Sequence, residues 1–180
     1  VAGASFNPMD GQVNSLLLLK ALHLAFQNLG GTYQPHHAVG DIQNESDPYI
    51  VKGGDFKLTA DKVVLAAGVA ISGLASKIGL GAKVRPVRGQ VLVSEKLKPC
   101  LPIPATEFVQ TDSGNLLIGN VEEKTGFDDS TNVETLSRMA RRALSIFPDL
   151  QNVQIIRTWG ALRVMTPDGC SVYHRSANNP

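Results

Sequence analysis

Residues 157–169 read Arg-Thr-Trp-Gly-Ala-Leu-Arg-Val-Met-Thr-Pro-Asp-Gly, so a tryptophan and an arginine stand four residues apart just before a turn. The planar guanidinium of Arg163 can hold a carboxylate through two parallel hydrogen bonds, and Trp159 can supply an apolar wall beside it. The alternative is a surface arginine that packs near a core tryptophan. Trp159 and Arg163 are therefore candidate substrate-binding residues, and both interpretations stay open.

The composition is that of a globular protein and excludes some functions. Of 180 residues, 43% are hydrophobic and 18% are charged, which is ordinary for a chain with a packed core. Lys plus Arg (17) nearly balances Asp plus Glu (16), so we expect no nucleic-acid partner. Apolar runs such as Leu16–Leu19 are far shorter than the roughly 18 residues that span a bilayer, so we expect no transmembrane segment.

Two features of the sequence bear on its compartment and extent. Cys100 and Cys170 stand far apart in unrelated contexts, so neither a disulfide framework nor a Cys-x-x-Cys pair is expected. A reducing compartment fits best: we expect the cytoplasm, with peripheral attachment to the inner face of a membrane as an alternative. The chain opens on Val1 and has no signal-peptide pattern, which is typical of a piece of a longer protein.

The first half of the chain predicts a helix followed by a small sheet. Asn14 can cap a helix that is apolar on most sides and ends at Gly30, so we expect this helix to be mostly buried. Short strands broken by turn residues, including Tyr49–Lys52 and Phe56–Thr59, predict a β-meander. The apolar run Lys62–Gly68 lacks alternation and predicts a central parallel strand covered on both faces.

The second half predicts a β-rich region with one covering helix. Strands are expected at Val84–Ser94, Phe108–Thr111 and Asn115–Asn120. Thr131 and Glu134 form the spacing of a capping box, and the amphipathic helix that follows should stop at Pro148 and cover one face of a sheet. The chain thus predicts an α+β fold with a mixed, largely antiparallel sheet packed against helices.

Other polar clusters favour structural roles. His36 and His37 are adjacent, and neighbours on a strand point to opposite faces, so we expect no metal site. The acidic pairs Glu122-Glu123 and Asp128-Asp129 are expected to be solvated turns without a role in acid–base catalysis. The basic residues of the second helix are expected to form a solvated face, with docking of a partner as the alternative: Arg138, Arg141 and Arg142.

Five short segments occur in an order that is specific when taken together. They are Asp10–Asn14, Val63–Gly68, Arg85–Gln90, Gly114–Gly119 and Trp159–Gly169. In this order they resemble the D-amino-acid oxidase superfamily of FAD-dependent oxidoreductases, in the branch of glycine oxidase, sarcosine oxidase and D-amino-acid dehydrogenase. The sequence departs from the family pattern where Ala-Gly is inverted to Gly160-Ala161 and where the usual proline after the arginine is Val164, which leaves the substrate open.

The resemblance implies a domain plan and a cofactor, FAD. It implies that the chain is part of an α/β FAD-binding fold, lacking the Gly-x-Gly-x-x-Gly segment and the closing glycine-rich segment. Residues 1–81 would belong to the FAD-binding domain, 82–163 to the substrate-binding domain and 164–180 to a return segment. Residues matching the family's cofactor-binding positions are Val39, Ala66, Ala67 and Gly68, and small side chains there suit close approach of a dinucleotide.

The resemblance also implies a reaction. A hydride would pass from the α-carbon of an amino acid or secondary amine to the flavin, while Arg163 holds the substrate carboxylate and Trp159 lies beside it. No catalytic base in this chain is implied. The alternative is a non-catalytic subunit or interaction domain of a multi-subunit amino-acid dehydrogenase. Expected partners are the small-molecule substrate and either a second copy of the chain or a partner subunit.

Overall fold

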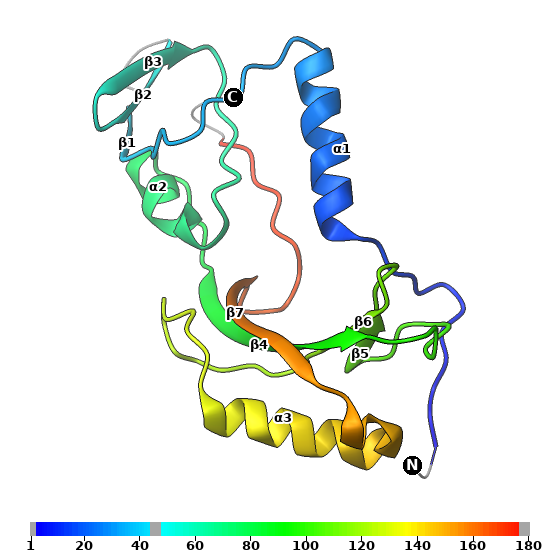
Figure 1. The fold of residues 1–180 in the computed structure, drawn as a ribbon. Helices are drawn as coiled ribbons and strands as arrows, with labels where there is room; N and C mark the ends of the chain where they lie inside the picture. Colours follow the sequence, from blue (N-terminus) through cyan, green and yellow to red (C-terminus); the bar gives the residue numbers. More distant parts are fainter. Residues whose placement is uncertain (1–2, 44–47, 177–180) are drawn as a thin grey trace. The chain divides into compact units, whose positions relative to one another are not determined.

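The computed structural model describes residues 3–43 and 48–176, which divide into two compact units (Figure 1). The first unit comprises residues 1–30 and 87–162, and the second comprises residues 31–86 and 163–180. Helices and antiparallel sheets occur together in the described residues, so the α+β prediction is confirmed.

The first unit contains a four-stranded sheet in the order β5-β6-β4-β7. Strand β6 is antiparallel to both of its neighbours, β4 and β5. The three strands that the sequence predicted here are confirmed to within two residues at either end. The bounds are Arg85–Lys96 for β4, Phe108–Gln110 for β5, Asn115–Ile118 for β6 and Ile155–Met165 for β7.

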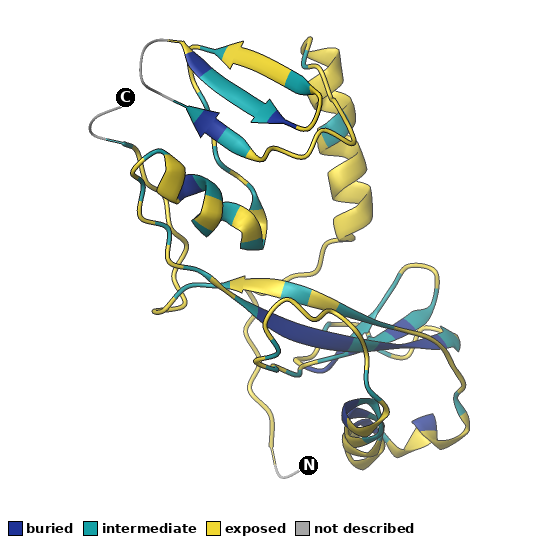
Figure 2. Ribbon diagram, turned by 90° about the vertical axis from the view of Figure 1, so that its left-hand side faces the viewer, coloured by how far each residue is buried: buried dark blue, intermediate teal, exposed yellow. Residues whose placement is uncertain are grey.

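Helix α3 (Val133–Ile146) covers one face of this sheet and closes the core of the unit. Alternation along a strand sends every second side chain to the same face, which brings Leu116 and Ile118 of β6 to the helix side. The buried core consists of Leu92, Phe108, Leu116, Ile118, Met139, Ala143 and Leu150. Figure 2 shows buried residues along β4 and on α3. The predicted covering helix is thus confirmed.

The start of α3 differs from the prediction by one residue. Asn132, not Thr131, is the N-cap, because its extended backbone (φ −132°, ψ 144°) lets Oδ1 accept a 2.8 Å hydrogen bond from the Thr135 backbone N–H. Asparagine is at least as favourable an N-cap as threonine, so Asn132 can take the cap position in place of Thr131. The predicted stop is confirmed: α3 ends before Phe147, and Pro148 opens the short 3-10 helix η2 (Pro148–Asn152).

The second unit contains the predicted meander, in the order β1-β2-β3 with antiparallel neighbours. Its strands are β1 (Asp41–Gln43), β2 (Tyr49–Gly53) and β3 (Phe56–Ala60). Helix α2 (Ile71–Lys77) packs against β1. Lys77 pairs with Asp41 at 3.3 Å, and Ile42, Tyr49 and Ala75 are buried.

The parallel strand predicted at Lys62–Gly68 does not form. Residues 62–67 carry no regular structure and lead into the 3-10 helix η1 (Gly68–Ala70) and then α2. A central parallel strand exists only where strands on both sides satisfy its backbone N–H and C=O groups. None of the described strands pairs with this run, so its apolar composition alone does not make it a strand.

Helix α1 (Ser15–Asn28) has the predicted ends but not the predicted burial. The Asn14 side chain accepts a 3.2 Å hydrogen bond from the Leu17 N–H, and Gly30 follows the helix with φ +86°. No residue of α1 is buried, as Figure 2 shows, because no described element covers its apolar sides. With 14 residues, α1 is also too short to cross a bilayer, and no other helix of the described residues could cross one.

Candidate functional site

Strand β7 carries both predicted substrate-binding residues. Trp159 is half-buried in the first unit, and Arg163 is exposed at the point where the second unit resumes. Because side chains alternate along a strand, Trp159 and Arg163 project from the same face of β7. The guanidinium of Arg157 lies over the Trp159 ring, 5.6 Å from its centroid, in a cation–π arrangement.

At Gly160, the face of β7 opposite to Trp159 and Arg163 directly contacts the backbone of residues 129–130. A Cβ atom at Gly160 would lie 2.2 Å from the Asp129 carbonyl oxygen and 2.9 Å from the Ser130 carbonyl oxygen. No side chain fits there, so this position requires glycine. The contact explains why glycine directly follows Trp159 here, and alternation turns the Trp159 side chain away from the 129–130 loop.

The Ala66-Ala67-Gly68 segment forms a turn in the second unit. Gly68 has φ +57°, a conformation that glycine adopts readily, and the Ala67 carbonyl accepts a 3.1 Å hydrogen bond from the Ala70 N–H. A Cβ at Gly68 would lie 3.9 Å from Val164 Cγ2, and apart from the residues adjacent in the chain no other described residue comes as near. The turn therefore lies against the residue that directly follows Arg163.

The same turn leaves its backbone open, which fits a dinucleotide cofactor. Ala66 and Gly68 are exposed and Ala67 is half-buried. With methyl groups or hydrogen as side chains, backbone atoms here leave room for close approach of a pyrophosphate or ribose, which nucleotide-binding turns require. The residues present at 66–68 thus suit the FAD that the sequence motifs imply.

Val39 lies in the irregular segment before β1, and its backbone is held in place. The Gly40 N–H donates a 2.8 Å hydrogen bond to the Lys52 carbonyl. A Cβ at Gly53 would lie only 2.0 Å from the Ala38 carbonyl oxygen, so glycine at 53 allows the segment to approach β2. The Val39 side chain itself is 37% exposed.

His36 lies in a turn with Pro35, and His37 directly follows this turn. His36 has φ +63°, a conformation that ends extended structure. His37 Nδ1 lies 2.8 Å from the Pro35 carbonyl oxygen, and its ring is 4.9 Å from that of Phe56. Within residues 3–43 and 48–176, no group of three or more His, Cys, Asp or Glu side chains is placed to hold a metal ion.

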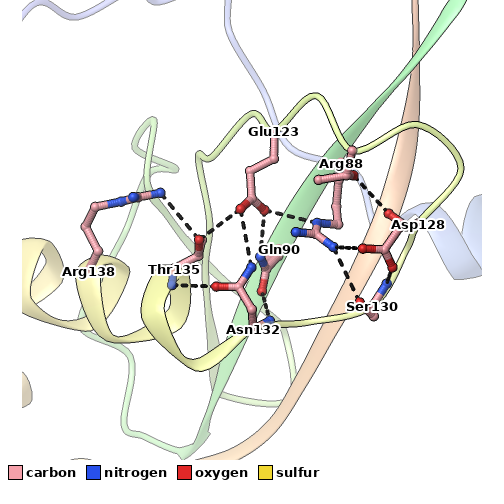
Figure 3. Close-up of polar contacts among 9 residues, drawn as sticks. Arg88, Gln90, Glu123, Asp128, Ser130, Asn132, Thr135 and Arg138 are labelled. Atoms are coloured by element: carbon pink, nitrogen blue, oxygen red, sulfur yellow. Dashed lines mark hydrogen bonds and ion pairs between the residues drawn. The ribbon is translucent and has the colours of Figure 1, made fainter.

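A buried polar network in the first unit overturns the prediction that Glu123 lies in a solvated turn (Figure 3). Glu123 pairs with Arg88, whose Nε donates to Glu123 Oε2 at 3.1 Å, and the Glu123 side chain is only 18% exposed. Gln90 Nε2 donates to the same oxygen at 2.6 Å, and Thr135 Oγ1 donates to Glu123 Oε1 at 2.9 Å. Glu123 joins β4 to the start of α3.

The surroundings of Glu123 keep its carboxyl group ionised. Burial by itself raises the pKa of this carboxyl, but hydrogen bonds from Gln90, Arg88, Thr135 and Asn132 outweigh burial and lower the pKa from 4.5 to about 2. A group with this pKa cannot exchange a proton usefully near neutral pH. Glu123 is therefore a structural anion rather than an acid–base catalyst.

The three arginines of α3 are exposed, as a solvated face requires, and two of them also make side-chain contacts. Arg142 pairs with Glu107, and Arg138 Nη2 lies 3.5 Å from Thr135 Oγ1. Both arginines line a pocket of about 300 Å³ between β6 and α3. None of the predicted substrate- or cofactor-binding residues lines this pocket.

Sequence reasoning missed the polar network, although a signal for it was present. Arg88 and Gln90 are two residues apart on a predicted strand, so both side chains point to one face. That face is the one covered by α3, and a buried guanidinium and amide require partners. The missing information was the position of Glu123, which is 35 residues from Arg88 along the chain.

Comparison with known proteins agrees with these motifs. The family model described as FAD dependent oxidoreductase (DAO) matches residues 1–179. An opine oxidase subunit of Agrobacterium tumefaciens is 37% identical over 180 residues, covering 100% of this chain and 48% of that protein. Glycine oxidase of Geobacillus kaustophilus is 30% identical over 176 residues, covering 94% of this chain and 46% of that protein.

A solved structure has a similar fold. The crystal structure of glycine oxidase from Geobacillus kaustophilus matches with a TM-score of 0.89 and 25% identity, over 96% of this chain and 48% of that one. The chain spans about half the length of the curated relatives it matches. The family predicted from five ordered motifs is confirmed: the chain belongs to the FAD dependent oxidoreductase (DAO) family, whose cofactor is FAD.

Proposed function

We propose that the protein containing this chain oxidises an amino acid or a secondary amine, with Arg163 holding the substrate carboxylate and Trp159 forming an apolar wall beside it. The observation that carries this proposal is the 3.9 Å approach between Val164 and the Gly68 position. It sets the residue after Arg163 against a turn whose small side chains suit FAD. Two relatives are named for the oxidation of opine and of glycine, which supports an amine or amino-acid substrate.

In this proposal, one group of residues meets the cofactor and another binds the substrate. Val39, Ala66, Ala67 and Gly68 would meet FAD through backbone. When bound, FAD supplies the acceptor for a hydride from the substrate α-carbon. Arg163 fixes the carboxylate and so orients the C–H bond, an entropic advantage that intramolecular models value at roughly 7–11 kcal/mol. The imine product hydrolyses in water, and solvent takes the amine proton, so no base from this chain is needed.

The domain plan is part of the same proposal. Residues 1–81 would serve FAD binding, 82–163 substrate binding, and 164–180 would return toward the FAD-binding domain. Cys100 and Cys170 are both free thiols, which suits a reducing compartment, and we propose the cytoplasm. Cell fractionation followed by detection of the protein checks the compartment.

The test of the function uses the protein expressed from its complete reading frame. We expect flavin absorption bands that bleach when amino acids or secondary amines are added without oxygen. Arg163→Ala should raise the KM for carboxylate-bearing substrates roughly 10- to 150-fold, because a charge-assisted hydrogen bond is worth about 1.5–3 kcal/mol. Arg141→Ala, which removes an exposed arginine of α3, is the matched control. A colourless protein, or equal KM values for both variants, contradicts the proposal.

A second candidate function rests on one observation, that the opine oxidase relative is named as a subunit rather than as a whole enzyme. The protein would then work inside a multi-subunit enzyme, either as its flavin-bearing subunit or as a non-catalytic one. Purified alone, a flavin-bearing subunit takes up FAD and is bleached by substrate. A non-catalytic subunit stays colourless and is found with amine oxidation only in a larger native assembly, which size-exclusion chromatography of the active fraction detects.

A further inference from the structure

The loop that joins β6 to α3 is held by buried polar side chains from β4. Arg88 is 5% exposed and Gln90 is fully buried, and both reach residues of this loop. We name Arg88, Gln90, Glu123 and Asp128 the Glu123 clamp. Backbone hydrogen bonds between Arg88 and Glu123, of 2.9 and 3.0 Å, add an antiparallel bridge at the same place.

Arg88 links both ends of the loop segment 123–130. Its Nε donates to Glu123 Oε2, and its Nη1 donates to Asp128 Oδ2 at 2.5 Å (Figure 3). The other oxygen of Asp128 accepts a 2.9 Å hydrogen bond from the Ser130 backbone N–H. The backbone at residues 128–130 is therefore fixed relative to β4 by one guanidinium and two carboxylates.

The same backbone presses against β7. The carbonyl oxygens of Asp129 and Ser130 occupy the space that a side chain at Gly160 would need. Gly160 stands one residue after Trp159 and three residues before Arg163 in β7. The clamp thus acts on β7 on the face opposite to the one from which Trp159 and Arg163 project.

We propose that Glu123 and Arg88 are positioning residues for the substrate, because they hold residues 128–130 against Gly160 and so fix the part of β7 that carries Trp159 and Arg163. This inference rests on the proposed function, in which those two residues bind the substrate. Glu123 and Arg88 do not touch the substrate. Their effect is geometric, and a misplacement of about 1 Å in a binding group can cost on the order of a hundredfold.

The test measures binding of a carboxylate rather than turnover. The protein from the complete reading frame is loaded with FAD, and the Kd of acetate is read from the change it causes in the flavin absorption spectrum. Glu123→Gln should raise this Kd about tenfold or more. Glu122→Gln, a change of the same charge on the exposed neighbour, should leave it within about twofold. Flavin content and the thermal midpoint show that each variant is folded.

A milder variant covers the case in which Glu123→Gln does not fold. Asp128 has a side chain that is 50% exposed, so Asp128→Asn removes one arm of the clamp without burying an unpaired charge. We expect a severalfold rise in the acetate Kd. An unchanged Kd in a folded Asp128→Asn protein, together with an unchanged or unmeasurable Kd in Glu123→Gln, overturns the inference.

A double-mutant cycle separates positioning from general loosening. If the clamp works through β7, Glu123→Gln should change the acetate Kd less than about twofold once Arg163 is already alanine. Full additivity of the two changes overturns the inference and leaves the role of Arg163 intact. If Arg163→Ala alone leaves acetate binding unchanged, the proposed function itself fails, and the clamp inference falls with it.

Discussion

Acid stability offers a quantitative check on the Glu123 clamp. The pKa of Glu123 lies at about 2 in the folded protein instead of 4.5, because hydrogen bonds from Gln90, Arg88, Thr135 and Asn132 outweigh the effect of burial. One pK unit corresponds to about 1.4 kcal/mol, so the ionised carboxylate contributes about 3 kcal/mol to the free energy of unfolding at neutral pH. Glu123→Gln should lower the free energy of unfolding by about this amount, because it removes the charge and also turns an NH₂ group toward the hydrogen-bond donors.

The sign of the pH dependence follows from the lowered pKa. The stabilisation is fully present above about pH 4.5 and is lost as the pH falls through about 2. The stability difference between the native protein and Glu123→Gln should therefore shrink from about 3 kcal/mol near pH 7 to about 1 kcal/mol near pH 3. Arg88 stays charged over this whole range, so Glu123 is the group in this pair that titrates.

The assay is equilibrium unfolding in urea, followed by circular dichroism, at several pH values from neutral to acid. Glu122→Gln is the matched control and should differ from the native protein by no more than about 0.5 kcal/mol at each pH. A difference for Glu123→Gln that stays constant between neutral and acid pH would refute the reasoning. So would a Glu123→Gln protein as stable as the native one near pH 7.

Three further predictions test local features of the fold. Gly160→Ala should cost about 1–3 kcal/mol or more, since the added methyl group meets backbone carbonyls. Gly119→Ala, directly after β6, has its nearest contacts at 3.9 Å and should cost less, and urea midpoints compare the two variants. Asn132→Ala should cost about 1 kcal/mol in thermal unfolding, and Thr131→Ala should cost little, because only Asn132 caps α3. Gly68→Ala should lower the FAD content of the purified protein, measured by absorbance, since φ is +57° there and the turn is proposed to meet the cofactor.

The ends of most elements could be predicted because the signals for them act over a few residues. Asn14 and Gly30 bracket α1, and Pro148 ends α3, through hydrogen bonds and backbone conformations confined to one turn of helix. The prediction of a cap at Thr131 missed by one residue, because two good capping residues are adjacent and local pattern cannot choose between them. The family was likewise readable, since five short motifs in a specific order suffice.

Burial could not be predicted in the same way, because it depends on which segments meet. The run 62–68 has the composition of a central strand, and α1 has that of a buried helix, yet no described element pairs with the first or covers the second. The composition of a segment shows only which environments its side chains are compatible with. Its partners decide whether a strand forms or a helix is covered.

By itself, the sequence determined helices α1 and α3, the strands β2 to β6, the family and the residues expected to meet substrate and cofactor. Only the tertiary structure decided that Glu123 is a partly buried anion and that Gly160 leaves room for the backbone of residues 129–130. Both facts depend on contacts between residues about 30 or more positions apart, such as Arg88 with Glu123. Such contacts form only when the chain folds. A local sequence pattern cannot predict them, because they are stabilised by packing across the whole unit.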